Sequence, residues 1–177
     1  MKADVRPRRL AAVATALTLA GFAAGSPPPA DAAEPSIRGK PAVDFALKAV
    51  AGQNVRLSEH LGEVVVLNFW ATWCGPCRQQ MPRLDQLHAT YRSAGLVLLG
   101  VNVDDDTEEA AEFVRTLGLG YPVLLDPRKS VAPLYDVDAL PMTVLVDRAG
   151  VVRYVHYDYS PAIEKQYVSE LRQLLDE

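Results

Sequence analysis

The order of apolar and polar residues predicts a series of β-strands. Two long runs of apolar, β-forming residues, at 64–70 and 96–103, indicate strands that are buried on both faces. Shorter apolar segments on either side of the Gly-containing turns 51–54 and 147–150 indicate two β-hairpins. In chain order, the predicted strands cover 43–50, 55–57, 64–70, 96–103, 122–125, 142–146 and 151–157.

Between these strands, apolar residues recur at spacings of three and four, which is the period of an amphipathic helix. Asp106, with Glu109 three residues later, resembles a capping box, and Ser160-Pro161 is typical of an N-cap and first helical residue. Strands that alternate with helices, followed by a hairpin and a last helix, predict a mixed α/β sheet with helices on both faces. The predicted helices cover 75–93, 106–117, 128–135 and a C-terminal segment that begins at Pro161 and includes Leu174.

The first 32 residues have the layout of a secretory signal peptide. Basic residues at 2–9 precede an uncharged, mostly apolar run at 10–24, and Ala30-Asp31-Ala32 forms a small-residue cleavage site. The apolar run is shorter than the roughly 20 residues that a membrane helix needs. We therefore expect cleavage after Ala32, a linker at 33–37 and one domain at 38–177, exported to the periplasm or cell envelope. An uncleaved membrane anchor is the alternative.

Charge and length narrow the function classes. Without the leader, the chain has 14 basic and 20 acidic residues and a net charge of −6. This balance argues against a nucleic-acid-binding role, which favours a basic face. The remaining 145 residues are enough for one domain with a hydrophobic core. We expect a soluble monomer.

The only cysteines are Cys74 and Cys77, separated by Gly-Pro. As a structural disulfide this pair would contribute little, because a two-residue loop barely restricts the unfolded chain. As a zinc site it would supply two of four ligands, and His60, His88 and His156 are scattered along the chain. A reversible redox pair is the favoured interpretation. A non-catalytic metal-binding or interaction module with an inert Cys-x-x-Cys remains the alternative from another class.

The predicted position of the pair supports redox chemistry. Cys74 falls between a buried strand and the start of a helix, where free N–H groups and the helix dipole favour a thiolate. Cys77 lies one turn inside the helix and suits the role of resolving cysteine. Gly75 lets a partner's backbone approach, and Pro76 is tolerated in a first helical turn. Trp73, beside Cys74, is expected to line the substrate surface.

The segment "VVVLNFWATWCGPCRQQMPRLDQL", at 64–87, resembles the active-site region of the thioredoxin fold. Residues 38–176 as a whole resemble the TlpA/ResA-like exported thiol-disulfide oxidoreductases, which are related to the AhpC/TSA and Redoxin proteins. The resemblance implies a three-layer α/β/α fold with an N-terminal β-hairpin and a helix-strand insertion at 106–125.

The resemblance also implies roles for particular residues. Cys74 would be the nucleophile and Cys77 the resolving cysteine, acting on protein disulfides without a cofactor or metal. Pro141 would be a cis-proline that faces the disulfide, and Leu140 would pair with an extended substrate segment. An exported protein of this kind would receive electrons from a membrane donor of the CcdA/DsbD type. Because Gly-Pro places no charge between the cysteines, we expect a reductant of protein disulfides.

Three positions depart from related proteins. Asn68 stands where thioredoxins have a buried Asp, and Gln80 stands where many relatives have Glu. Neither side chain can accept the proton of Cys77, so water is the expected acceptor. Met142 stands where the cytochrome c maturation branch usually has Glu, although reduction of haem-binding apoprotein cysteines remains an alternative function.

Two further site types are disfavoured. A thiol peroxidase would have Thr or Ser three residues before its reactive cysteine and Pro four residues before that. Ala71 and Leu67 occupy those positions ahead of Cys74, and Cys74 and Trp70 occupy them ahead of Cys77. The acidic run 104–106 is more typical of a strand-end cap and a solvated loop than of a cation site.

Overall fold

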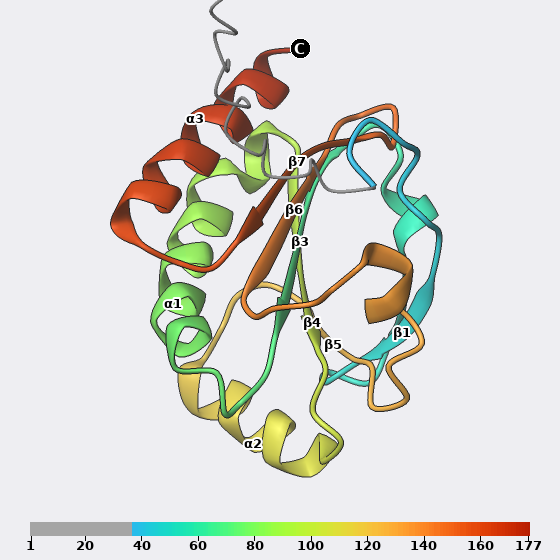
Figure 1. The fold of residues 1–177 in the computed structure, drawn as a ribbon, viewed down its shortest axis with the longest axis vertical. Helices are drawn as coiled ribbons and strands as arrows, with labels where there is room; N and C mark the ends of the chain where they lie inside the picture. Colours follow the sequence, from blue (N-terminus) through green and yellow to red (C-terminus); the bar gives the residue numbers. More distant parts are fainter. Residues whose placement is uncertain (1–36) are drawn as a thin grey trace, which may run out of the picture. The chain divides into compact units, whose positions relative to one another are not determined.

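The computed structural model describes residues 37–177. The leader predicted at 1–32 and most of the predicted linker lie outside the described residues. The strands form one seven-stranded mixed sheet in the order β2-β1-β5-β4-β3-β6-β7, drawn in Figure 1. At its centre β3, β4 and β5 run parallel, and β6 pairs antiparallel with β3. The strands are β1 (Ala46–Ala49), β2 (Asn54–Arg56), β3 (Val64–Trp70), β4 (Leu96–Asn102), β5 (Val123–Leu125), β6 (Met142–Val146) and β7 (Val152–Tyr157).

Three α-helices and three short 3₁₀ helices connect the strands. The predicted N-caps are present: the Asp106 carboxylate accepts from the N–H groups of Glu108 and Glu109, and Ser160 Oγ accepts from the Ile163 N–H. The helices are α1 (Gly75–Tyr91), α2 (Thr107–Leu117), α3 (Pro161–Asp176), η1 (Leu57–His60), η2 (Arg92–Ala94) and η3 (Ala132–Tyr135).

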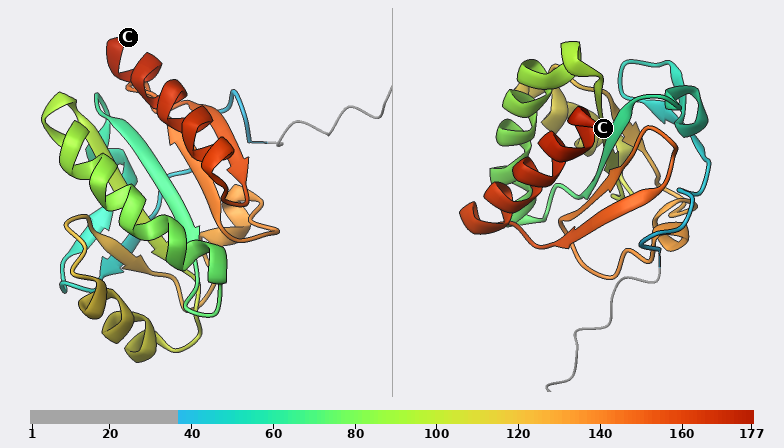
Figure 2. Two further views of the ribbon diagram at one scale, coloured as in Figure 1. Left: turned by 90° about the vertical axis from the view of Figure 1, so that its left-hand side faces the viewer. Right: turned by 90° about the horizontal axis from the view of Figure 1, so that it is seen from above.

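The two faces of the sheet carry different coverings. Side chains alternate along β3, so Asn68 and Trp70 point to the face that α1 and α3 cover side by side, as Figure 2 shows. Phe113 of α2 packs against the Trp70 ring on this face. Phe69 points to the opposite face, where its ring contacts Tyr135 of η3. The three-layer arrangement implied by the resemblance is therefore confirmed, with a thin outer layer on the second face.

That layer is thin because the helix predicted at 128–135 is only a 3₁₀ turn at its end. The buried Asp126 carboxylate accepts hydrogen bonds from the N–H groups of Ser130, Val131 and Ala132, at 2.8–3.1 Å. These N–H groups are thereby bonded to a side chain, in an Asx-type turn, and a helix does not start before Ala132.

The N-terminal hairpin is also shorter than predicted. β1 begins at Ala46, whereas the prediction began at residue 43, because the Asp44 side chain bonds the end of β2 and the start of η1. Its carboxylate accepts from the Ser58 N–H at 3.0 Å and from the Arg56 guanidinium at 2.9 Å. The hairpin itself and the inserted α2–β5 unit are present as expected. Within residues 37–177, no helix combines the length and apolar character that a membrane span requires.

Candidate active site

Cys74 and Cys77 lie at the start of α1, directly after the loop that follows β3. They form a disulfide, and their Cα atoms are 5.3 Å apart. Cys74 is the N-cap of α1, and its Sγ accepts a hydrogen bond from the Cys77 N–H at 3.2 Å. Cys74 is 5% exposed and Cys77 is fully buried. Cys74 is therefore the sulfur that another protein reaches first.

The start of α1 favours negative charge at Cys74. The first N–H groups of a helix have no intrahelical acceptor, and the helix dipole is positive at this end. Pro76 stands in this first turn, where its missing N–H removes no helical hydrogen bond. The arrangement expected from the sequence is thus present: an N-cap sulfur followed by a second sulfur one turn inside the helix.

The loop before Cys74 is held by the buried Asp104, which was predicted only to be part of a strand-end cap. Asp104 Oδ2 accepts from the Thr72 N–H at 2.9 Å and from Asn102 Nδ2 at 2.7 Å. Because Asn102 pairs with Trp70 across β4 and β3, Asp104 lies beside the loop that carries the cysteines. The signal in the sequence was an Asp directly after a buried strand, but its partner depends on the strand pairing.

Pro141 lies at the same end of the sheet as the cysteines. The Leu140–Pro141 peptide bond is cis, as the resemblance implied. The next residue, Met142, pairs with Phe69 near the end of β3, which places Pro141 beside the loop that leads to Cys74. Leu140 is half-buried, and Trp73 exposes 72% of its surface. Both residues border one hollow in the surface next to the disulfide.

Beneath the first turns of α1 lies a buried layer of neutral polar side chains. Asn68 Nδ2 donates to Gln80 Oε1 at 2.9 Å and to Thr143 Oγ1 at 3.2 Å, and Gln80 Nε2 donates to Thr143 Oγ1 at 3.0 Å. All three side chains are fully buried, and Asn68 Oδ1 has no hydrogen-bond partner among the described residues. Thr143 was not predicted as part of the site. This layer carries no ionisable group, so water remains the expected proton acceptor for Cys77.

Comparison with known proteins places this geometry in a family. Residues 38–155 match the AhpC/TSA family. The chain is 38% identical to thiol-disulfide oxidoreductase ResA of Geobacillus kaustophilus, over 66% of this chain and 67% of that protein. It is 32% identical to the ResA of Halalkalibacterium halodurans, over 77% of this chain and 76% of that protein. The chain belongs to the AhpC/TSA family.

Solved structures agree with this assignment. A Chlorobium tepidum protein assigned as the thiol:disulfide interchange protein DsbE is 37% identical, with a TM-score of 0.75. The match covers 78% of this chain and 97% of that one. With ResA relatives and the Cys74–Cys77 disulfide at the N-terminus of α1, this AhpC/TSA member is a thiol-disulfide oxidoreductase.

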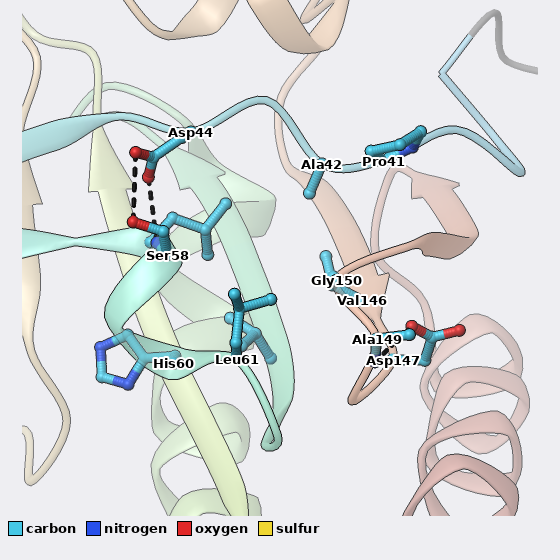
Figure 3. Close-up of a pocket in the computed structure, with 12 residues that line it drawn as sticks. Pro41, Ala42, Asp44, Ser58, His60, Leu61, Val146, Asp147, Ala149 and Gly150 are labelled. Carbon is cyan, nitrogen blue, oxygen red and sulfur yellow. Dashed lines mark hydrogen bonds between the residues drawn. The ribbon is translucent and has the colours of Figure 1, made fainter.

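Two other features of residues 37–177 of this AhpC/TSA member concern metal binding and a second hollow. Among residues 37–177, no three His, Cys, Asp or Glu side chains gather closely enough to hold a metal ion. A second, mostly apolar hollow lies at the opposite end of the sheet, between the chain at Pro41–Asp44, η1 and the β6–β7 turn (Figure 3). Val65 and Val146, at the far ends of β3 and β6 from the cysteines, line it. The carboxylate of Asp44, which lines this hollow, accepts hydrogen bonds from the Ser58 hydroxyl and the Arg56 guanidinium.

Proposed function

We propose that this protein is an exported reductant of protein disulfides that acts through the Cys74/Cys77 dithiol. The observation that carries the proposal is the position of Cys74 as N-cap of α1, with the second sulfur buried one turn further along. Thiol-disulfide exchange requires this combination of one accessible, activated sulfur and a second sulfur within its reach.

The reaction proceeds in two exchanges. The Cys74 thiolate attacks one sulfur of a substrate disulfide, that S–S bond breaks, and the other substrate sulfur leaves as a thiolate. The Cys77 thiolate then attacks Cys74 Sγ, the Cys74–Cys77 disulfide forms, and the second substrate sulfur leaves. The substrate gains two electrons and takes two protons from water, while the protein dithiol loses two electrons and two protons.

Residues around the sulfur position the substrate in this proposal. Leu140, with its backbone next to the cis-Pro141, would pair with an extended segment of the substrate. Trp73 offers an exposed aromatic surface on the other side of Cys74. Gly75 is half-buried, and a Cβ placed on it would meet no atom within 4 Å, so a partner's backbone can approach there.

The direction of electron flow follows from the charges near Cys74. Strong oxidants of disulfides stabilise their thiolate and have potentials near −120 mV, whereas thioredoxin lies near −270 mV. Gly75 and Pro76 supply no charged side chain between the cysteines. Arg78, the nearest cation in sequence, lines a hollow that Glu109 and Glu112 of α2 also line. With no cation held at the sulfur, a potential close to that of thioredoxin is expected, which makes the protein a reductant.

A reductant outside the cytosol needs a source of electrons. Cytosolic thioredoxin cannot reach an exported protein, so we propose a membrane donor of the CcdA/DsbD type that reduces the Cys74–Cys77 disulfide after each cycle. The same exposed surface around Trp73 would meet donor and substrate in turn, because only the Cys74 side of the disulfide has any exposure.

Equilibration against glutathione or dithiothreitol buffers tests the proposal, with thiol alkylation or tryptophan fluorescence as the readout. The expected midpoint lies near −270 mV. A midpoint more positive than about −180 mV, the value for protein disulfide isomerase, would overturn the reductant assignment and leave the dithiol chemistry in place. A pair that does not exchange with either buffer would support the inert Cys-x-x-Cys module.

Export is tested by mass spectrometry of the protein isolated from its cells. A first residue at or near Ala33 is expected. An intact Met1 terminus in the membrane fraction would instead support an N-terminal anchor, with the same redox domain held at the membrane surface.

A second candidate within the same chemistry is reduction of haem-binding cysteines in apocytochromes c. The resemblance to TlpA/ResA-like proteins favours it, whereas Met142, in place of Glu, weighs against it. Reduction of a Cys-x-x-Cys-His peptide disulfide at least about tenfold faster than a Cys-x-x-Cys-Ala control, about 1.4 kcal/mol of discrimination, would favour this candidate. Equal rates would leave the general reductant.

A further inference from the structure

The hollow beside the disulfide is lined mostly by apolar residues and includes two charged ones. We name it the Trp73–Leu140 groove, after its two walls. Its floor and sides are mostly apolar, and its two charged lining residues are Lys129 and Asp138. Its lining consists of Trp73, Val103, Lys129, Ala132, Val137, Asp138, Ala139 and Leu140.

The two charged residues of the groove are not equivalent. Lys129 Nζ is 2.6 Å from Asp105 Oδ1, so its charge is matched by a neighbouring carboxylate. Asp138 is exposed and forms no ion pair with any residue between 37 and 177. The groove therefore has one unmatched charge, and that charge is negative.

Further carboxylates lie near Asp138. Burial raises the pKa of Tyr157, and the charges of Asp138 and Asp136 raise it further, which places both carboxylates within electrostatic range of that hydroxyl. Tyr157 pairs with Met142, and the Asp158 N–H donates to the Pro141 carbonyl oxygen at 2.9 Å. The Asp138 carboxylate thus lies within electrostatic range of a β7 side chain whose residue pairs with Met142, directly after Pro141.

From this arrangement we infer that the enzyme selects protein disulfides whose half-cystine is flanked by an apolar and a basic side chain. The inference rests on the proposed function. The apolar side chain lies in the Trp73–Leu140 groove, and the basic one lies against Asp138 at its rim. The groove lies close to the sulfur that the substrate bonds, because its lining residues Trp73 and Leu140 directly precede Cys74 and Pro141. Residues next to the half-cystine are therefore the ones that reach it.

Physical reasons favour this occupant over others. Trp73 exposes 72% of a large apolar side chain next to the reactive sulfur, and exposed aromatics of this size commonly serve binding. An acidic substrate segment would meet Asp138 without a nearby free cation in the groove lining. A basic segment gains attraction there, and that attraction weakens as salt screens it.

Single-turnover reduction of symmetric peptide disulfides of the form (acetyl-X-Cys-Y-amide)₂ tests the inference. The reduced protein is mixed with an excess of peptide, and tryptophan fluorescence follows formation of the Cys74–Cys77 disulfide. Each rate constant is divided by that of dithiothreitol with the same peptide, which removes differences in intrinsic sulfur reactivity. The X/Y pairs are Leu/Lys, Leu/Glu, Ala/Lys and Ala/Ala, each in both orders.

Peptides with Leu should have a normalised rate constant about tenfold higher than those with Ala, because the larger Leu side chain buries more apolar area in the groove. Lys should exceed Glu about threefold at low salt and by less in 0.5 M salt. Asp138→Asn should remove the preference for Lys and leave the preference for Leu, and Asp138→Lys should reverse the charge preference. Glu59→Gln, at an exposed position in η1, should leave both preferences unchanged.

The outcomes separate this inference from the proposed function. Equal normalised rates for all peptides, with reduction proceeding, would overturn the inference and keep the reductant. A charge preference that survives in Asp138→Asn would overturn the assignment to Asp138. Absence of reaction with every peptide, including Ala/Ala, would overturn the proposed function itself.

Discussion

The two ends of the sheet differ in how their polar groups are bonded. At the β6–β7 turn, the Asp147 carboxylate accepts from the N–H groups of Ala149 and Val151 and from the Arg153 guanidinium, at 2.9–3.1 Å. Beside it, the Arg148 guanidinium donates to three backbone carbonyl oxygens from separate segments. The charged groups of this turn are all bonded within the protein, and they fasten segments that are distant in sequence.

At the cysteine end of the sheet, several side chains are exposed or lack a bonding partner among the described residues. Cys74 is 5% exposed, Trp73 is mostly exposed, Asp138 has no ion pair among the described residues, and Asn68 Oδ1 has no partner among them. The exposed groups contribute little to folding stability and can serve chemistry or binding, whereas the unpaired Asn68 oxygen costs folding free energy. Substitutions of the cysteines should therefore change reactivity, whereas substitutions at the β6–β7 turn or in the buried polar layer beneath α1 should change stability.

The largest expected effect is on reactivity and comes from the cysteines themselves. Cys74→Ser should lower disulfide reduction by at least about 10³-fold, because the remaining thiol, Cys77, is fully buried and a substrate disulfide cannot reach it. Cys77→Ser should retain the first exchange and accumulate mixed disulfides with substrates, because the resolving sulfur is missing. Non-reducing gels of an envelope extract check this. Identical behaviour of the two variants, without adducts, would contradict the assignment of nucleophile and resolving cysteine.

A carboxylate in the neutral layer beneath α1 should destabilise the protein at neutral pH. In Asn68→Asp, full burial raises the carboxyl pKa in the folded state above its unfolded value of about 3.9. Stability is then close to wild type below that value and is lost as pH rises toward the folded pKa. The expected loss is about 3–4 kcal/mol at pH 7, since each unit of pKa shift corresponds to about 1.4 kcal/mol.

Urea denaturation at pH 4.5 and pH 7.5 measures this difference. Asn54→Asp, at an exposed position in β2, is the matched control and should show no pH-dependent change. An Asn68→Asp variant that is equally stable at both pH values would show that the layer accommodates a charge.

At the opposite end, Arg148→Ala should lower stability without changing reactivity. Its guanidinium bonds the carbonyl oxygens of Gly62, Ala94 and Leu175 at 3.0, 3.4 and 3.1 Å. Loss of these charge-assisted bonds should cost about 2 kcal/mol and lower Tm by roughly 4–8 °C. Arg128→Ala, an exposed arginine, is the control. A rate constant for disulfide exchange that falls along with Tm would show that the two ends are coupled.

Much of the fold followed from the sequence because its signals are local. The continuous apolar run of β3, the Gly that ends η2 and the Ser-Pro start of α3 each depend on residues a few positions apart, and each element lies where it was predicted. The redox pair was found for the same reason, since both cysteines and the helix start are contiguous. Pro82 lies inside α1, and the helix continues on both sides of it.

The remaining features depend on contacts between distant segments. Asp104 fixes the loop before Cys74 only because β4 pairs with β3, and Thr143 joins Asn68 only because β6 lies on the other side of β3. A turn formed by Asp126 lies where the first part of the helix 128–135 was predicted. The Asp126 carboxylate accepts from the N–H groups of Ser130 and Val131, which would have been free at the start of that helix. No periodic pattern in the sequence encodes these partners.

The smallest expected effect is a pH dependence of stability in the second half of α1, away from the cysteines. Burial lowers the pKa of the His88 imidazole below its usual value of 6.5; the charge of Asp85 opposes this effect, and that of Arg92 adds to it. The His88 ring lies 6.3 Å from the ring of Tyr121. Below pH 6.5 the unfolded chain binds a proton that the folded protein does not, so stability is complete above that pH and falls as pH decreases.

Replacement of this group should reduce the acid sensitivity. His88→Gln should lose less stability than wild type between pH 7.5 and pH 5.5, measured by urea denaturation at each pH, while disulfide exchange at pH 7.5 stays unchanged. The difference between the two proteins isolates His88, because the other titrating groups are common to both. Equal losses would show that His88 is protonated as readily in the folded protein as in the unfolded chain, and the acid sensitivity would then belong to other groups.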